Sequence, residues 1–316
     1  MSDNNYNLAF VFPGQGSQSI GMLNDLSEAY PIIKQTFERA SDALGKDLWK
    51  LASEGPVDVL NQTQNTQPVM LTAGFAIWQL WCKSSSIKPA WMAGHSLGEY
   101  TALVCANAIK FEDAVKLVAD RGLYMQEAVL GTGGAMAAIL GLDDPKVIEI
   151  CNSSALDQVV SPVNFNAPGQ VVIAGDCDAV ERAMVAAKDA GARRAVKLPV
   201  SVPSHCSLMK PAAEKLEQRL NEIEIESPDV TLIHNVDVAS HNAPDVIRNA
   251  LSEQLYKPVR WVDTIKFMHE QGVTQFVECG PGKVLMGLNK RIAKDADHFS
   301  IFNSETLENV LESING

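Results

Sequence analysis

Short apolar runs alternate with longer amphipathic segments along most of the chain. The runs at residues 7–12 and 89–93 predict buried strands, and residues 274–279 predict a late strand of the same sheet. The longer segments predict helices over residues 30–44, 68–81, 97–106, 111–128 and 283–294. Strands that alternate with helices are typical of an α/β domain with a mostly parallel sheet.

A different order of elements occupies the middle of the chain, after Gly131-Thr132-Gly133-Gly134. The pattern predicts strands over 135–140, 159–164, 170–174 and 195–199, and helices over 145–153 and 179–190. This β-α-β-β-α-β order is the ferredoxin-like pattern. We therefore expect a ferredoxin-like small domain (131–200) inserted into a discontinuous large α/β domain (1–130 and 201–316).

The composition is that of an ordinary globular protein, with 46% hydrophobic and 20% charged residues among 316. The formal net charge of −12 argues against general nucleic-acid binding, which needs clustered positive charge. The longest apolar stretch, residues 69–82, is interrupted by Thr72 and Gln79 and is too short to cross a bilayer. The first residues lack the features of a secretory signal. We expect a cytoplasmic protein that binds neither membrane nor nucleic acid.

The six cysteines form neither a CxxC pair nor a metal-ligand spacing, so we expect reduced, mostly buried thiols. No metal and no other cofactor is indicated. Cys206 directly follows a candidate catalytic histidine, and a reactive thiol there is a minor alternative.

The strongest chemical motif is Gly94-His95-Ser96-Leu97-Gly98, between a predicted strand and a predicted helix. At such a turn, Gly-x-Ser-x-Gly forms a nucleophile elbow whose glycines leave room for the sharp bend. The Ser96 hydroxyl would project from the sheet edge, and the N–H of Leu97 would point toward a developing oxyanion. The alternative is a serine that only caps the helix. We favour Ser96 as a covalent nucleophile.

The loop Gly14-Gln15-Gly16-Ser17-Gln18 follows the first predicted strand. It lacks the third glycine of a dinucleotide-binding loop, and the chain has no Gly-x4-Gly-Lys-Ser/Thr phosphate loop. Gln15 could lend its amide to an active site, or the loop could simply be polar. The motif alone does not decide between them.

Arg121 lies within an apolar helical stripe that also includes Ala114, Leu117, Val118 and Met125. An arginine on an inward face is costly unless it is paired. Its fork of donors suits a carboxylate held by two hydrogen bonds. That carboxylate could belong to a substrate or to a buried Asp or Glu.

His205 lies where the chain would return from the small domain. Imidazole is the natural general base for a serine, but a lone histidine is usually structural, so position alone does not single it out. The His95 side chain should point away from the face of the nucleophile. The other histidines (His234, His241, His269 and His298) lie in segments without another catalytic signal.

In their order and spacing, these motifs resemble the malonyl-CoA:acyl-carrier-protein transacylases of bacterial fatty-acid synthesis. The resemblance covers essentially the whole chain. It rests on four segments, FVFPGQGSQ (10–18), GHSLGEY (94–100), VNFNAPGQ (163–170) and ECGPGKVL (278–285). The residues before His205 fit the fatty-acid enzymes better than methylmalonyl-selective polyketide domains.

The resemblance implies a role for each matching residue. Ser96 would be acylated by malonyl-CoA, with His205 as its general base. The side chain of Gln15 and the N–H of Leu97 would hold the oxyanion. Arg121 would bind the malonyl carboxylate, and the main-chain carbonyl of Gln254 would orient His205. The resemblance also implies an α/β-hydrolase-like large domain, no cofactor, and acyl carrier protein as the acceptor.

An acidic carrier protein would need a positive patch on this acidic chain. Two clusters could provide one, Lys283, Lys290, Arg291 and Lys294 near the last predicted helix, and Arg193, Arg194 and Lys197 at the end of the small domain. A solvated surface explains either cluster equally well. A monomer is the default expectation.

Two other functions remain open at this stage. An esterase or thioesterase of the α/β-hydrolase type would use Ser96 with an acid between it and the histidine. The acids after Arg121 fall in the expected small domain, and the hydrolase oxyanion motif is missing. The third possibility is a catalytically silent acyl-binding subunit.

Overall fold

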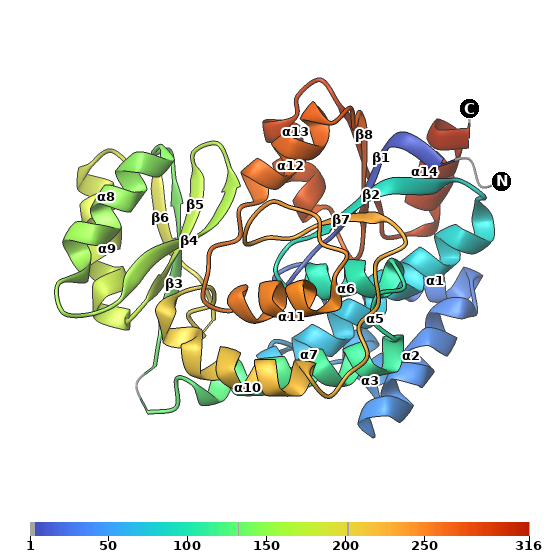
Figure 1. The fold of residues 1–316 in the computed structure, drawn as a ribbon, viewed down its shortest axis with the longest axis horizontal. Coiled ribbons are helices and arrows are strands. Elements are labelled where there is room, and N and C mark those ends of the chain that lie inside the picture. The colour runs from blue at the N-terminus through green and yellow to red at the C-terminus, as the bar shows by residue number, and fades with distance from the viewer. Residues whose placement is uncertain (1–3, 132, 201, 316) are drawn as a thin grey trace.

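Two β-sheets and their covering helices make up the computed structural model, which describes residues 4–131, 133–200 and 202–315 (Figure 1). The strands are β1 (Asn4–Phe12), β2 (Lys88–Gly94), β3 (Ala135–Leu140), β4 (Val160–Ala167), β5 (Gln170–Gly175), β6 (Arg194–Lys197), β7 (Thr231–Ile233), β8 (Gln275–Cys279) and β9 (Asp297–Ile301). The helices are α1 (Asn24–Ala29), α2 (Ile32–Leu44), α3 (Leu48–Ser53), α4 (Val57–Leu60), α5 (Thr63–Ser84), α6 (Gly98–Cys105), α7 (Phe111–Glu127), α8 (Asp144–Ala155), α9 (Cys177–Asp189), the 3-10 turn η1 (Ser207–Met209), α10 (Lys210–Leu220), α11 (Pro244–Glu253), α12 (Trp261–Glu270), α13 (Val284–Ile292) and α14 (Ser304–Asn315).

The larger sheet has the strand order β7-β2-β1-β8-β9, and its pairings are parallel. Along β1, Leu8, Phe10 and Phe12 pack into the core that includes α5 and α6. Ala9 and Val11 point the other way, into the core beneath α12 and α13. Because both faces are covered, β1 needs a continuous apolar run rather than an alternating one.

The smaller sheet, at the left of Figure 1, is antiparallel with the order β4-β5-β3-β6. Ala137 and Ile139 of β3 pack against α8 and α9 on its outer face. Met136 points to the opposite face, where it packs with Cys206 of the larger unit. The expected α/β fold with a mostly parallel sheet is confirmed, and an antiparallel second sheet accompanies it.

The edge strand β4 joins the smaller sheet to the segment that precedes α12. The N–H of Phe165 donates to the carbonyl of Val259 at 3.0 Å, and the N–H of Val259 donates to the carbonyl of Val163 at 2.8 Å. On the same side, Arg291 of α13 donates to the Gln170 side chain and to the carbonyl of Pro168. The segment just after Gln254 is therefore held by the smaller sheet.

Every strand and helix predicted above has a counterpart in the structure, with ends displaced by a few residues. The largest displacement is at α5, which begins at Thr63 and passes through Pro68, where the pattern predicts its start. The first turn of α5 is supported by α7, since a Cβ at Gly122 would lie 2.6 Å from the Cα of Gln64. Thr132 and Ser201, which lie next to the predicted domain boundaries, and residues 1–3 and 316 lie outside the described residues.

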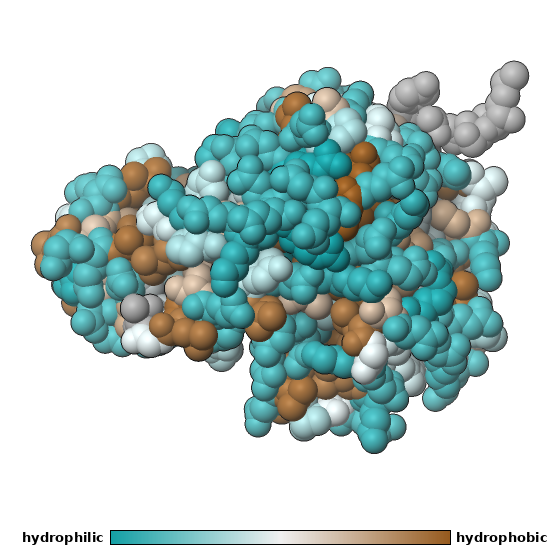
Figure 2. Space-filling model, turned by 60° about the horizontal axis from the view of Figure 1, so that its bottom comes forward, coloured by the Kyte–Doolittle hydropathy of each residue, from teal (hydrophilic) through white to brown (hydrophobic). Residues whose placement is uncertain are grey.

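The face shown in Figure 2 is mostly hydrophilic, with hydrophobic residues in separate patches. Four of the six cysteines are buried, Cys177 is half-buried and Cys82 is exposed. The described helices include none that is long and apolar enough for a membrane span.

Candidate active site

Ser96 lies on a sharp turn between β2 and α6. Its backbone φ is 52°, in the left-handed region that L-residues rarely adopt. A Cβ at Gly94 would lie 1.9 Å from the carbonyl carbon of Gly98, and a Cβ at Gly98 would lie 2.0 Å from the carbonyl oxygen of Phe12. The two glycines are therefore required for the turn that presents the serine hydroxyl.

His205 lies directly against this hydroxyl, although 109 positions separate the two residues. Ser96 Oγ is 2.7 Å from His205 Nε2, and His205 Nδ1 is 2.6 Å from the carbonyl oxygen of Gln254. A carbonyl can only accept, so Nδ1 carries the proton and, in a neutral ring, Nε2 accepts from the serine. The pair is arranged for proton transfer from Ser96 to His205.

Burial keeps this imidazole neutral. Removal from water, and then the positive charge of Arg121, lower the pKa of His205 to about 3. A neutral imidazole at physiological pH is the form that can act as a base.

Arg121 of α7 is completely buried beside the same hydroxyl. One terminal nitrogen donates to Gln67 Oε1 at 2.7 Å, and the other donates to Gln254 Oε1 at 3.0 Å and approaches Ser96 Oγ at 3.5 Å. The guanidinium also lies over the ring of Tyr100, 5.3 Å from its centroid. Among the described residues it has no carboxylate partner, and its Nε has no hydrogen-bond partner.

The N–H of Leu97 and the loop that carries Gln15 lie close together beside the elbow. The N–H of Leu97 donates to no acceptor within the described part of the chain, as expected at the start of a helix. A Cβ at Gly14 would lie 3.7 Å from this nitrogen, so the loop that carries Gln15 passes close to it. Gln15 itself is exposed, and its amide lies 3.4 Å from Thr63 Oγ1.

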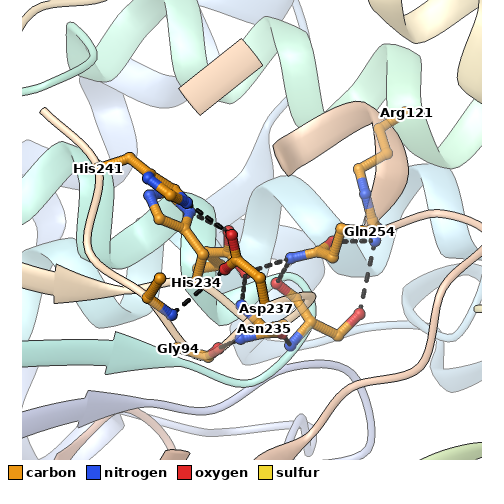
Figure 3. Close-up of polar contacts among 10 residues, drawn as sticks. Gly94, Arg121, His234, Asn235, Asp237, His241 and Gln254 are labelled. Atoms are coloured by element: carbon orange, nitrogen blue, oxygen red, sulfur yellow. Dashed lines mark hydrogen bonds and ion pairs between the residues drawn. The ribbon is translucent and has the colours of Figure 1, made fainter. Parts of the chain in front are cut away.

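A buried polar network surrounds these groups (Figure 3). Gln254 lies between Arg121 and the elbow, and its Nε2 donates to the Ser96 carbonyl at 3.0 Å and to Glu99 Oε2 at 2.8 Å. Asn235 Oδ1 accepts from the Ser96 N–H, and its Nδ2 donates to the carbonyl of Gly94. Glu99 Oε1 lies 2.7 Å from His234 Nδ1.

The site also contains four residues that were not predicted from the sequence, Gln67, Glu99, Asn235 and His234. Glu99 had a signal, since it lies one helical turn after Ser96 in an otherwise apolar helix. The loop with His234 and Asn235 follows β7, a three-residue strand without a clear pattern.

Two other candidates, His95 and Cys206, make their side-chain contacts with residues outside the serine–histidine pair. The His95 side chain is 2.8 Å from Asn166 Oδ1 on β4 and packs against Trp261. Cys206 donates to the carbonyl of Pro203, and burial raises the pKa of its thiol to about 12, which argues against a reactive thiolate. The described residues contain no group of His, Cys, Asp and Glu that could hold a metal ion.

Comparison with known proteins agrees with this geometry. Residues 9–303 match the family model described as the acyl transferase domain. The chain belongs to this acyl transferase family. The turn at Ser96 therefore lies in a chain of a group-transfer family.

Close relatives of this acyl transferase carry one name. The chain is 58% identical over 284 residues to the malonyl CoA-acyl carrier protein transacylase of Escherichia coli strain K12. The matched region covers 90% of this chain and 92% of the relative. It is 44% identical over 310 residues to the protein of that name from Bacillus subtilis, with 97% of each chain covered.

Solved structures show the same likeness. A malonyl CoA-acyl carrier protein transacylase from Coxiella burnetii superposes with a TM-score of 0.96 at 52% identity, covering 98% of each chain. A malonyl-transacylase solved in complex with its type II polyketide-synthase acyl-carrier protein has a TM-score of 0.96 at 53% identity, covering 97% of this chain and 99% of that one.

Proposed function

We propose that this acyl transferase moves a malonyl group from malonyl-CoA to the phosphopantetheine thiol of acyl carrier protein, in fatty-acid synthesis. The observation that carries the proposal is Arg121, a fully buried cation beside the Ser96 hydroxyl without a carboxylate partner among the described residues. A buried charge of this kind is costly unless an anion arrives to pair with it. The relatives named malonyl transacylases support the choice of malonyl as that anion.

In the first step, Ser96 Oγ attacks the thioester carbonyl of malonyl-CoA while its proton moves to His205 Nε2. The carbonyl π electrons move onto oxygen, and the N–H of Leu97 and the amide of Gln15 would hold the resulting oxyanion. When the oxyanion collapses, the carbon–sulfur bond breaks, His205 returns its proton to the departing sulfur, and malonyl remains as an ester on Ser96.

In the second step, the same groups act in reverse on the carrier. His205 takes the proton of the phosphopantetheine thiol as the sulfur attacks the Ser96 ester. The ester carbon–oxygen bond then breaks, and His205 returns the proton to Ser96 Oγ. No metal or redox cofactor is required by this exchange. General-base help is typically worth about 10²–10⁴ in rate, and one oxyanion donor about 10²–10³.

We further propose that the larger unit, residues 1–130 and 201–316, is α/β-hydrolase-like, and that residues 131–200 form a ferredoxin-like small domain. The strand order β4-β5-β3-β6, with α8 and α9 following β3 and β5, supports the second assignment. The elbow at the end of a parallel strand supports the first.

We also propose a monomer in the cytoplasm. Six free cysteines support a reducing compartment. For the carrier, the exposed side chains of Lys283, Lys290 and Lys294 and those of Arg193 and Arg194 remain the two candidate docking clusters.

The test is a two-stage labelling experiment. The protein is exposed briefly to malonyl-CoA, and holo acyl carrier protein is then added while intact masses of both proteins are recorded. Malonyl should appear on the wild-type chain, be absent in Ser96→Ala, and pass to the carrier. Steady hydrolysis without the carrier would support an esterase, and the absence of any adduct would support a silent acyl-binding subunit.

A further inference from the structure

Glu99 is a buried carboxylate that touches two side chains and one backbone N–H around the elbow. It lies in the first turn of α6, and its side chain has no exposed surface. Oε2 accepts from Gln254 Nε2 at 2.8 Å and from the Asn235 N–H at 3.0 Å, while Oε1 lies 2.7 Å from His234 Nδ1. It makes no hydrogen bond to Ser96 Oγ or to Arg121, although its negative charge acts on Arg121 through space. Its contacts with the site are those to Gln254, Asn235 and His234.

Glu99 is one of two acceptors that fix which way the amide of Gln254 points. Nε2 faces two groups that can only accept, the Glu99 carboxylate and the carbonyl of Ser96. Oε1 faces Arg121, which can only donate. A turned amide would place oxygen against oxygen and N–H against guanidinium, so the carboxylate holds Gln254 in the orientation that Arg121 needs.

The main chain of Gln254 also contacts the general base, His205. Its carbonyl accepts from His205 Nδ1, so the residue that positions Arg121 also orients the imidazole. Glu99 also accepts from the Asn235 N–H. The Asn235 side-chain amide bridges the Ser96 N–H and the Gly94 carbonyl at the strained elbow. Glu99 thus lies where the constraints on Arg121, His205 and Ser96 meet.

We propose that Glu99 is a positioning residue for acyl transfer, which holds Gln254 so that Arg121 discriminates for an anionic acyl group. The inference rests on the proposed function. It makes a prediction that a merely structural role does not make. A less stable fold would lower malonyl and acetyl transfer together, whereas a misplaced Arg121 lowers the ratio of malonyl to acetyl transfer.

The test measures the rate of Ser96 acylation by malonyl-CoA and by acetyl-CoA in single turnovers. Glu99→Ala should lower the malonyl-to-acetyl ratio by about tenfold or more, which corresponds to losing a hydrogen bond to a charged group. Glu99→Gln is the matched variant, because its amide oxygen can still accept from Gln254 while its nitrogen faces His234. It should restore the ratio to within about threefold of wild type.

A double variant shows whether Glu99 acts through Arg121. In Arg121→Ala the discrimination is already lost, so adding Glu99→Ala should not lower the ratio further. An unchanged ratio in folded Glu99→Ala, or an additive loss in the double variant, would overturn the inference. Malonyl labelling of wild-type Ser96 is scored separately, so the proposed function can stand when this inference fails.

If Glu99→Ala does not fold, the structure of Glu99→Gln decides. A Gln254 amide that still faces Arg121 with an unchanged ratio supports the inference, as does a turned amide with a lowered ratio. A Gln254 amide that still faces Arg121 with a lowered ratio would overturn it, and so would a turned amide with an unchanged ratio.

Discussion

Arg121 is the residue on which the proposed choice of an anionic acyl group depends. Its guanidinium is held by two amide oxygens, those of Gln67 and Gln254, and by the face of Tyr100, all of them uncharged. These direct partners hold the group in place without adding charge, and the Glu99 carboxylate acts on it only through space. A carboxylate delivered beside Ser96 would therefore gain a strong, charge-assisted contact.

Replacing Arg121 by alanine should remove this selectivity. We expect Arg121→Ala to lose malonyl acylation of Ser96 by about 10²-fold, the scale of a charge-assisted hydrogen bond, while acetyl acylation is retained or improved. Parallel single-turnover rates with the two thioesters measure this. Arg219→Ala, which removes a half-buried arginine paired with Asp120 and Glu222, is the control and should leave the ratio unchanged. Equal loss for both acyl groups would mean that Arg121 is structural.

The pH dependence of acylation should reveal the buried imidazole. Because the pKa of His205 is lowered to about 3 by burial and by Arg121, the base stays neutral well below pH 6.5. The acylation rate should therefore hold from pH 8 down to about 5, where an exposed histidine would be protonated. A fall in rate centred near pH 6.5 in rapid-quench measurements would contradict this.

The free energy of unfolding, unlike the acylation rate, should fall as the pH is lowered, because of the same imidazole. The folded pKa lies below the unfolded one, so the unfolded chain binds the extra proton and stability falls as the pH drops from about 6.5 toward about 3. The slope for one proton is about 1.4 kcal/mol per pH unit. Urea unfolding of wild type and His205→Asn should show that the variant lacks this part of the slope. Asparagine is chosen because it tolerates the positive φ of 66° at this position.

How far single residues could be predicted depends on whether they carry a local pattern. Ser96 and Arg121 stand out because a turn motif and an apolar stripe frame them. Asn235 could not be found this way, since its role comes only from folding next to Ser96, 139 positions away. His205 lacked a local signal, and only the resemblance to a family pointed to it.

At the scale of elements, the site is built where β2 ends and α6 begins. The parallel neighbour β1 ends beside this turn, and the N–H of His95 donates to the carbonyl of Phe12 at 2.9 Å. The apolar runs made these two strands easy to predict. The short β7 and the helices α11 and α12 were not predicted, although the segments next to them supply Asn235 and Gln254.

The elbow glycines should be the least tolerant positions of this element. Gly98→Ala should destabilise the fold by about 3 kcal/mol or more, because the new Cβ would lie 2.0 Å from the backbone oxygen of Phe12. The control is Gly287→Ala in the exposed part of α13, where a new Cβ meets nothing within 4 Å. That variant should be stabilised by about 0.5–1 kcal/mol. Chemical unfolding measures both, and equal stabilities would contradict the packing argument.

At the scale of the whole molecule, the smaller sheet and the larger unit meet beside the reacting pair. β4 bonds to Val259 through its backbone and to His95 through Asn166, while His205 lies in the segment that returns from the smaller sheet. The order of elements predicted that the chain leaves and re-enters the larger unit. It could not predict this contact, which depends on tertiary packing of β4.

Charge distribution over the whole surface should guide the carrier. With a net charge of −12, the chain repels an acidic partner except at a local positive cluster. Lys290→Glu should raise KM for the carrier about fivefold at low salt, and less at high salt, without changing the acylation rate by malonyl-CoA. Lys116→Glu, with the same change of charge on α7, is the control. Arg291 is avoided because it also bonds to Gln170 and Pro168.

The most direct test of the account is the intact mass of the protein after brief exposure to malonyl-CoA. The account predicts one malonyl adduct on wild type, located on the peptide that contains Ser96 and absent in Ser96→Ala. The adduct should disappear when holo acyl carrier protein is added, as the carrier gains the same mass. A wild-type protein without an adduct, or an adduct that persists in Ser96→Ala, would contradict it.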